Sequence, residues 1–329
     1  MVVDASRWLA IVNPVAGSGK GLTDWPEISR LLRHSDIAVD PVFTEHKYHG
    51  IELTVEGVNR GYRKIIVVGG DGTIHEVVNG LFIQKQTPTQ DVLLSVIAVG
   101  TGNDWIRMFG IPRKYSEAVK AILQGHSFLQ DVGAVSYYKS NCPHTRYMAN
   151  VAGIGFDAYV NKKYNALKDE GRYSKWLYIW SALKSVLNYT STGVKVWVDG
   201  ALAVDEPVYS ATVGIGKYNG GGMIQMPDAV ADDGLLDMTV IRKMSRLLVL
   251  SRFRSLYNGK IYRIRKVSMS RGRRIQIESA PDIRIEVDGE ALGFSPLEFE
   301  VIDKAIRVVV SEKFLGDSVV SQKETGKMR

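Results

Sequence analysis

Apolar residues in the first 130 positions alternate between short continuous runs and helical spacing. Residues 8–12, 65–68 and 93–99 form apolar runs typical of buried strands, with 65–68 rich in β-branched types, and residues 38–43 are predicted to form another short strand. Between these runs, apolar residues recur every three or four positions, which predicts helices; Pro26 suits the first turn of one, and Ser116 and Gly125 are predicted to cap another. Strands that alternate with helices predict an α/β fold with a doubly wound parallel sheet.

After about residue 131 the pattern changes to strict alternation. Residues 194–198, 274–278 and 283–287 alternate apolar with polar side chains, and Asp199-Gly200 and Asp288-Gly289 are typical of hairpin turns. Further strands are predicted over residues 208–215, 235–241 and 297–302, and a helix over 174–189. The alternation indicates a second, mostly β domain, a sandwich or barrel. We therefore place an α/β domain at residues 1–133 and a β-rich domain at 134–303.

Three glycine-rich loops follow predicted strands, at residues 13–21, 69–73 and 100–104. Glycine lets a backbone approach an anion closely, and the start of a helix favours phosphate. One such loop is about as often a plain turn, but the carboxyl ends of parallel strands share one edge. Three loops on that edge favour a nucleotide or phosphate site. The first is not a Walker A motif, because Pro14 and Gly21 stand where that motif needs glycine and a hydroxyl residue.

The composition indicates an ordinary globular protein: of 329 residues, 45% are hydrophobic and 23% charged. Cys142 is the only cysteine, so an intrachain disulfide is excluded, and a small buried residue is a better interpretation than a nucleophile. The first residues do not have the pattern of a signal peptide, and the longest apolar run, residues 92–99, is too short to span a membrane. We expect a cytoplasmic protein, at most peripheral to a membrane.

The net charge of +7 is concentrated in one region, because residues 242–274 contain twelve lysines and arginines and no acidic residue. This indicates an anionic partner. An anionic membrane surface fits, since Leu247, Leu248, Leu250 and Phe253 lie among the arginines and suit shallow insertion. A solvated basic face is the plain alternative. Nucleic acid ranks lowest because neither an RNA-binding motif nor an aromatic platform is evident, and a homodimer stays open.

Several motifs, in order along the chain, carry a family resemblance. They are Asn13-Pro14 with its glycine-rich continuation, Gly69-Gly70-Asp71-Gly72-Thr73, Glu76-Val77-Val78-Asn79-Gly80, Gly100-Thr101-Gly102-Asn103-Asp104, Gly220-Gly221-Gly222-Met223, Asp232-Asp233-Gly234-Leu235-Leu236-Asp237 and Val287-Asp288-Gly289-Glu290. Together they resemble the bacterial branch of the diacylglycerol kinase catalytic family, which includes sphingosine and ceramide kinases. The Gly-Gly-Asp-Gly-Thr motif alone is also found in NAD kinases and, in variant form, in phosphofructokinases. The later motifs favour the lipid-kinase branch.

The resemblance implies an α/β nucleotide-binding domain, a β-rich second domain, an active site between them, and a final segment, 304–329, that returns to the first domain. It also implies ATP and Mg²⁺ as cofactors, with Asp71 as the carboxylate engaging the catalytic Mg²⁺. The implied nucleotide contacts are Asn13, Pro14, Val15, Ala16, Gly17, Thr44, Gly69, Gly70, Asp71, Gly72, Thr73, Ile74, His75 and Thr101. His75 departs from the family, where asparagine is common, and an imidazolium there would make ATP affinity depend on pH.

By the same resemblance, Glu290 is the general base that takes the proton of the lipid hydroxyl, although a carboxylate beside a turn is usually only solvated. A structural Mg²⁺ site is implied at the Asp233 carboxylate and the carbonyls of Leu235 and Val230, with water-mediated links to Asp104 and Asp131.

The sequence thus predicts an ATP-dependent lipid kinase that phosphorylates a hydroxyl of diacylglycerol or a related lipid. The alternatives are a kinase of a soluble substrate such as NAD and a non-catalytic sensor of lipid or nucleotide.

Overall fold

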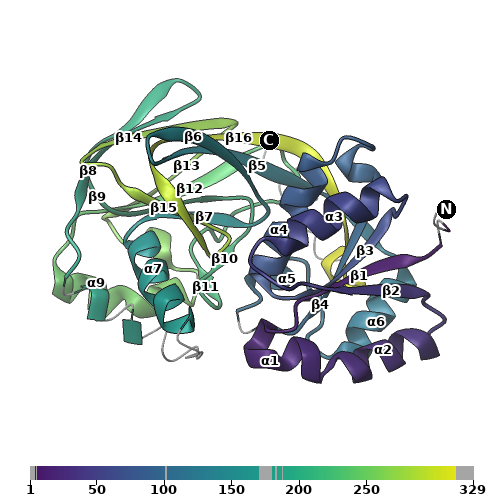
Figure 1. Ribbon diagram of the computed structural model, residues 1–329. Coiled ribbons are helices and arrows are strands. Elements are labelled where there is room, and N and C mark those ends of the chain that lie inside the picture. Colours follow the sequence, from purple (N-terminus) through teal and green to yellow (C-terminus); the bar gives the residue numbers. More distant parts are fainter. Residues whose placement is uncertain are drawn as a thin grey trace, which may run out of the picture. The chain divides into compact units, whose positions relative to one another are not determined.

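The computed structural model describes residues 4, 6–100, 102–169, 180–181, 184–186 and 188–315 (Figure 1). They divide into two compact units: the first runs to Gln130 and resumes at Ala305, and the second runs from Asp131 to Lys304. The predicted helix over residues 174–189 falls largely outside the described residues.

The first unit is built around parallel strands. Its elements are β1 (Trp8–Val12), α1 (Ala16–Thr23), α2 (Trp25–His34), β2 (Val39–Phe43), α3 (His49–Asn59), β3 (Lys64–Gly69), α4 (Asp71–Ile83), the 3-10 turn η1 (Thr89–Asp91), β4 (Leu93–Ala98), α5 (Asp104–Met108) and α6 (Tyr115–Gln124). The strand order is β2-β1-β3-β4, and Arg307 and Val308 of the last strand, β16 (Glu290–Val309), pair with the outer side of β4. All of these pairings are parallel, as predicted.

Helices cover both faces of this sheet (Figure 1). On one face, Ile28 and Leu32 of α2 and three residues of α6 pack on Trp8, Ala10 and Val12 of β1. On the other face α3 approaches β1 so closely that a Cβ atom at Gly57 would lie 2.3 Å from the Leu9 side chain. The doubly wound α/β fold is therefore confirmed.

The helix ends of α6 show one wrong detail of the sequence prediction. Gly125 caps its C-terminus in a left-handed conformation, φ 67°, as expected. Ser116, however, lies inside the helix, because α6 already begins at Tyr115, with Lys114 as the residue at its N-cap. Lysine is not a preferred N-cap residue, whereas serine is, so the sequence pattern favoured Ser116 although the helix begins before it.

The second unit consists mostly of antiparallel strands. Its elements are β5 (Ser127–Lys139), β6 (Cys142–Met148), β7 (Val151–Gly155), α7 (Phe156–Asp169), β8 (Thr192–Val198), β9 (Ala201–Gly214), β10 (Tyr218–Asn219), β11 (Met223–Ile224), β12 (Leu236–Arg242), α9 (Arg246–Arg252), the 3-10 turns η2 (Phe253–Leu256) and η3 (Ile261–Arg263), β13 (Val267–Gly272), β14 (Arg274–Ala280), β15 (Arg284–Val287) and most of β16.

The pairing of these strands forms a closed circuit, β9-β8-β14-β16-β15-β7 and back to β9, with β12 and β13 extending one side. Long strands such as β9 take part in two halves of the circuit, so apolar side chains from both halves face one interior. The predicted β-sandwich-like second domain is confirmed. In Figure 1, α7 and α9 lie together at one side of these strands.

Both predicted hairpin turns are present. Asp199 and Gly200 have φ 48° and 82°, and Asp288 and Gly289 have φ 50° and 87°, the two successive left-handed residues of a tight hairpin. The β5–β6 hairpin was not predicted. It turns at Ser140 and Asn141, φ 51° and 60°, which give a much weaker sequence signal than a pair with glycine.

Candidate functional site

The glycine-rich loops of the first unit meet at one edge of its sheet. The N–H of Asn13, just after β1, donates to the carbonyl of Val68 (2.9 Å), and Val99, just after β4, donates to the carbonyl of Gly69 (3.0 Å). Thr44, after β2, donates in the same way to the carbonyl of Val12 (2.9 Å). The ends of the four strands are thus held side by side, at the edge where α/β sheets bind ligands.

Two contacts between these loops require glycine. Gly17 has φ 60°, and a Cβ atom there would lie 1.9 Å from the carbonyl oxygen of Val99. A Cβ atom at Gly100 would lie 2.7 Å from the Cα atom of Gly70. The backbones of the first and third loops, and of the second and third, are therefore in contact, which a side chain would prevent.

Side chains at this edge lock the loops to one another. Asn13 accepts the N–H of Val15 (3.2 Å) through Oδ1 and donates through Nδ2 to the hydroxyl of Thr73 (3.0 Å). The side chains of Thr44, Thr73 and Ile74 are buried, whereas Val15 is exposed. An approaching ligand would therefore meet backbone groups here more than these side chains. Thr101 lies outside the described residues.

His75 occupies a position different from the one its chemistry suggested. Its side chain is fully buried (0% exposed) in α4, and its ring nitrogens lie 3.4 and 3.5 Å from Nδ2 of Asn79, one turn further along. The imidazole therefore belongs to the interior of the unit. Any effect of His75 on nucleotide affinity would have to act through the packing of α4.

The carboxylate of Asp71 joins the second and third loops. Its two oxygens accept the N–H groups of Asp104 and Trp105, each at 3.1 Å, at the start of α5. A carboxylate offers about four acceptor positions, so an oxygen that accepts an N–H can also bind a cation. Asp104 is itself buried, and the carboxylates of Asp71 and Asp104 both border Gly102.

Two arginines beside these carboxylates were missed by the sequence prediction. Arg113 donates to the carbonyl of Gly102 (2.9 Å), and Arg107 pairs with Asp104 (3.3 Å). Burial, together with the nearby charge of Arg107, lowers the pKa of Arg113. The only sequence signal was two cations shortly after a glycine-rich loop. The edge thus combines backbone donors, two carboxylates and two cations, a set suited to an anion with a metal ion.

In the second unit, Glu290 follows the β15–β16 turn directly and is half-buried. Asp288 anchors this turn, because its carboxylate accepts the N–H groups of Ala149 (2.9 Å), Asn150 (2.9 Å) and Val151 (3.0 Å). The carboxyl group of Glu286 accepts the N–H of Gly289 at 2.8 Å. The turn that leads into Glu290 is therefore fixed by two carboxyl groups, one on β15 and one in the turn itself.

Glu286 is a buried acid with strongly altered chemistry. Burial raises the pKa of its carboxyl to about 8, and the negative charges of Asp157 and Asp288 act in the same direction. Burial likewise raises the pKa of Asp157. Asp157 lies 3.0 Å from Nε2 of Gln225, whose Oε1 accepts a hydrogen bond from Asn219 (3.0 Å).

Asp157 and Gln225 also line a mainly apolar pocket of the second unit. Most of the remaining lining comes from α7, β9, β11, β12, α9 and the segments that follow α9. It is mainly apolar, with Ser210 and Arg252 as further polar members, and includes Phe156, Val160, Tyr209, Met223, Ile241, Val249, Leu256, Ile261 and Ile264. Gly153 separates Asp157 from Glu286, since a Cβ atom there would lie 2.8 Å from Cβ of Asp157 and 2.5 Å from Oε1 of Glu286. The link between them runs through Asn219, which bonds both to Gln225 and to the carboxyl of Glu286. Polar groups thus lead from the pocket to the turn that precedes Glu290.

The implied structural metal site has oxygen donors in excess of cations. Asp131 accepts the N–H groups of Gly234 and Lys304, both at 2.7 Å, and burial raises the pKa of its carboxyl to about 6, with Asp303 contributing in the same direction. Burial also raises the pKa of Asp232. Crowded carboxyl groups with raised pKa values and oxygen-only donors fit a hard divalent cation.

Asp233 itself already has one cationic partner. Arg271 forms an ion pair with Asp233 and a second one, at 2.9 Å, with Asp237, and Oδ1 of Asp233 accepts the N–H of Leu235 (3.2 Å). A metal ion at Asp233 and the carbonyls of Val230 and Leu235 would share the carboxylate with Arg271. Asp131 and Asp233 belong to the second unit and Asp104 to the first.

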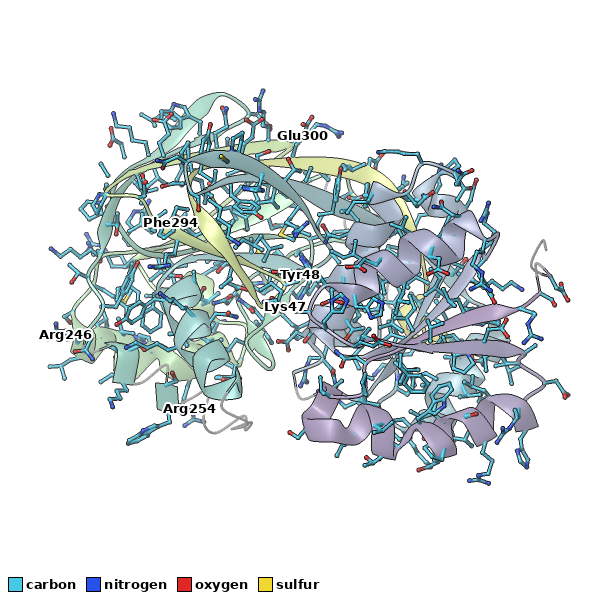
Figure 2. All side chains as sticks on the ribbon, in the orientation of Figure 1. Lys47, Tyr48, Arg246, Arg254, Phe294 and Glu300 are labelled. Atoms are coloured by element: carbon cyan, nitrogen blue, oxygen red, sulfur yellow. The ribbon has the colours of Figure 1, made fainter. Side chains whose placement is uncertain are left out.

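The basic stretch is partly neutralised and partly exposed. Arg242 pairs with Glu206 (2.6 Å) and Arg274 with Glu298 (2.5 Å). Around α9, by contrast, Arg246, Arg252 and Arg254 are exposed; Figure 2 labels the first and last of these. Between them Leu247 is 81% and Leu250 38% exposed. The outer side of α9 is therefore both basic and apolar, while Val249 lines the pocket.

Comparison with known proteins gives the family. Residues 7–135 match the diacylglycerol kinase catalytic domain, and residues 150–310 match the YegS C-terminal NAD kinase beta sandwich-like domain. The chain belongs to the diacylglycerol kinase catalytic-domain family. Kinases of this family use ATP. The edge of glycine loops lies within the first match, and Glu290 and the apolar pocket lie within the second.

Individual relatives agree over nearly the whole chain. A diacylglycerol kinase of Mycobacterium tuberculosis is 26% identical over 301 residues, which cover 91% of this chain and 94% of the relative. One of Staphylococcus aureus is 26% identical over 313 residues, 94% of each chain. A crystal structure of a diacylglycerol kinase from Bacillus anthracis str. Sterne superimposes with a TM-score of 0.71 at 23% identity, covering 95% of this chain and 99% of that one, and supports the fold.

Among the described residues, no helix has both the length and the apolar character needed to cross a membrane.

Proposed function

We propose that this protein is an ATP-dependent lipid kinase that transfers the γ-phosphoryl group of ATP to a hydroxyl of diacylglycerol or a closely related lipid. The observation that carries the proposal is the apolar pocket of the second unit and its polar connection to Glu290. A kinase that phosphorylates a soluble dinucleotide does not need such a pocket, whereas a lipid kinase needs one to bind the acyl chain of its substrate.

The pocket suits an acyl chain because its lining is aliphatic and aromatic, with few polar groups. The lining also carries Ser210 and Arg252. Asp157 and Gln225, which bond to each other at 3.0 Å, suit the ester and hydroxyl groups next to the chain. In a pocket of this kind, apolar burial supplies affinity and the few polar groups orient the ligand.

In the proposed reaction, Glu290 takes the proton of the lipid hydroxyl, the oxygen forms a bond to the γ-phosphorus, and the bond from that phosphorus to the bridging oxygen breaks and releases ADP. Phosphoryl transfer depends mainly on positioning and on stabilising charge. In the first unit, backbone N–H groups of the glycine loops, Arg107 and Arg113 suit the phosphate charge.

Mg²⁺, when bound, neutralises phosphate charge at the catalytic site and stabilises the fold at the structural site. Asp71 is the proposed carboxylate at the former. Asp233 with the carbonyls of Val230 and Leu235 would hold the latter, with Asp131 and Asp104 linked through water.

The proposed place of action is the surface of an anionic membrane. Arginines near such a surface contribute about 1 kcal/mol each, and the exposed Leu247 and Leu250 add apolar contact. Because Val249 of the same helix lines the pocket, α9 would bring the bilayer next to the pocket.

The first experiment tests substrate and chemistry together. The protein is incubated with labelled ATP, Mg²⁺ and a panel of diacylglycerol, monoacylglycerol, ceramide, sphingoid base and NAD. We expect label in a lipid product, which requires Glu290. Label in NADP alone would indicate the NAD-kinase alternative, and intact ATP with every substrate would indicate a sensor.

The second experiment tests the membrane surface. Leu247→Asp and Leu250→Asp should abolish flotation with anionic vesicles and lower activity on vesicle-borne diacylglycerol, but leave activity on a water-soluble short-chain diacylglycerol unchanged. Leu202→Asp, at a leucine 56% exposed on β9, is the matched control. Equal flotation of all variants would contradict the membrane proposal.

A further inference from the structure

The loop between β2 and α3 carries a cluster that the proposed kinase reaction does not use. His46 and His49 stack with ring centroids 4.4 Å apart and planes inclined by 12°. Glu52 lies one turn further along α3. One ligand atom from each of these three side chains lies within 4.8 Å of the other two.

A carboxylate from another helix holds this loop in place. Glu76 of α4 accepts the N–H of Tyr48 through one oxygen and the N–H of Gly50 through the other, both at 2.9 Å. Tyr48 is thereby held at φ 68°, a left-handed conformation that is unusual for its residue type. Lys47 places its ammonium group 5.0 Å from the centre of the Tyr48 ring; Figure 2 labels both residues. The histidines on either side of this pair are therefore carried by a fixed backbone.

The hydrogen bonds of the two rings define which nitrogens are ready to bind a metal. Nδ1 of His46 lies 3.1 Å from the carbonyl of Lys47, and since a carbonyl only accepts, Nδ1 carries a proton, so that in the neutral ring Nε2 is the nitrogen that can bind a metal. A ligating histidine commonly donates its second N–H to a carbonyl in this way.

Nδ1 of His49 accepts the N–H of Glu45 at 3.0 Å, so its Nε2 carries the proton. Ligation through Nε2 would move that proton to Nδ1 and break this one hydrogen bond. His49 is therefore the less prepared of the two ligands, and the site should release its ion readily on chelation.

We propose that His46, His49 and Glu52 bind one divalent transition-metal ion of the zinc class, separate from the Mg²⁺ of the kinase reaction. Two imidazole nitrogens and one carboxylate oxygen are a common ligand set for Zn²⁺, with further positions left to water. Mg²⁺ prefers oxygen ligands, so it competes poorly here.

The ion would bridge the loop to α3. Thr44, two residues before His46, is fixed to β1 at the edge where the glycine loops meet. Binding the ion would therefore restrict this edge and raise the thermal stability of the protein, because a ligand that binds the folded chain stabilises it.

The test uses the full, untagged chain after treatment with a chelator. Zn²⁺ is titrated in competition with a chromophoric chelator, and Co²⁺ binding is followed by its visible absorption. We expect one ion per chain, an increase in melting temperature, and no displacement by Mg²⁺ in large excess. His46→Ala and His49→Ala should each weaken binding by about tenfold or more, and Glu52→Gln by less.

His34→Ala is the matched control, because His34 is also exposed, at the end of α2, and lies outside the cluster. Circular dichroism establishes that each variant is folded. The proposal is overturned if Zn²⁺ binding is not stoichiometric, if His46→Ala binds as tightly as the wild type, or if a large excess of Mg²⁺ displaces Zn²⁺. Kinase activity is measured separately, so loss of the zinc site and loss of the proposed lipid kinase reaction are distinguished.

Discussion

The edge of glycine loops in the first unit and the turn of Glu290 in the second handle charge in opposite ways. The first relies on backbone geometry: Gly17 and Gly70 allow loops to touch, and Asp71 is satisfied by two N–H groups at the start of α5. The second relies on buried carboxyl groups, because Asp288 and Glu286 hold the turn and burial raises the pKa of Glu286. The first site should therefore respond mainly to added volume, and the second mainly to removed acceptors and to pH.

The largest effect is expected at the proposed base. Glu290→Gln keeps the size of the side chain but removes the proton acceptor, so kcat should fall by about 10²–10⁴-fold. Affinity for ATP, measured by calorimetry, should stay unchanged because the glycine loops are untouched. A kcat within about threefold of the wild type would show that another group accepts the proton.

The next largest effect is expected at Asp288, on stability. Asp288→Ala leaves three buried N–H groups without their acceptor, and each such group costs about 1–3 kcal/mol, so the free energy of unfolding should fall by about 4 kcal/mol. Urea denaturation measures it. Asp282→Ala, at an exposed aspartate of the same unit, is the control and should change stability by less than about 0.5 kcal/mol. Equal losses for both variants would contradict the anchoring role of Asp288.

The first unit offers a matched pair of glycines. Gly17 and Gly19 are both left-handed, at φ 60° and 89°, but a Cβ atom at Gly17 would lie 1.9 Å from a carbonyl oxygen, whereas at Gly19 nothing lies within 4 Å. Gly17→Ala should cost about 3 kcal/mol from conformation and collision together, and Gly19→Ala about 1 kcal/mol from conformation alone. Thermal unfolding and ATP titration test this difference. Similar losses in both variants would mean that the loops do not touch at Gly17.

Much of this architecture followed from local patterns. Runs of β-branched residues such as 65–68 predicted the parallel strands. Asp-Gly pairs predicted the hairpin turns at Asp199-Gly200 and Asp288-Gly289. The features that the sequence did not predict depend on contacts between residues that are far apart in the chain. Residues from β7, β9 and β15 surround Asp157 and Glu286 only after long-range pairing, so no local window reveals that these acids are buried.

Local sequence patterns also did not predict where single side chains lie in the fold. His75 follows a glycine motif that suggests an anion contact, but the helical period turns it into the interior. Arg113 lies beside the third loop because the chain bends back after α5, which the loop sequence does not encode.

The smallest of the four effects, and the one most specific to the second unit, is the pH dependence of Glu286. The unfolded chain releases this proton near the ordinary pKa of 4.5, whereas the folded chain holds it up to about 8. Between these values the folded state binds more protons, so the free energy of unfolding falls as pH rises, by about 1.4 kcal/mol per pH unit. From about pH 5.5 to pH 7 this amounts to about 2 kcal/mol, which Glu286→Gln should remove because glutamine does not titrate.

Since Asp131, Asp157 and Asp237 also have raised pKa values and contribute with the same sign, the measured quantity is the difference between wild type and variant in urea unfolding at each pH. A difference that is flat across this interval would show that Glu286 is ionised in the folded protein, and the second unit would then hold its turn with charge, as Asp71 does in the first.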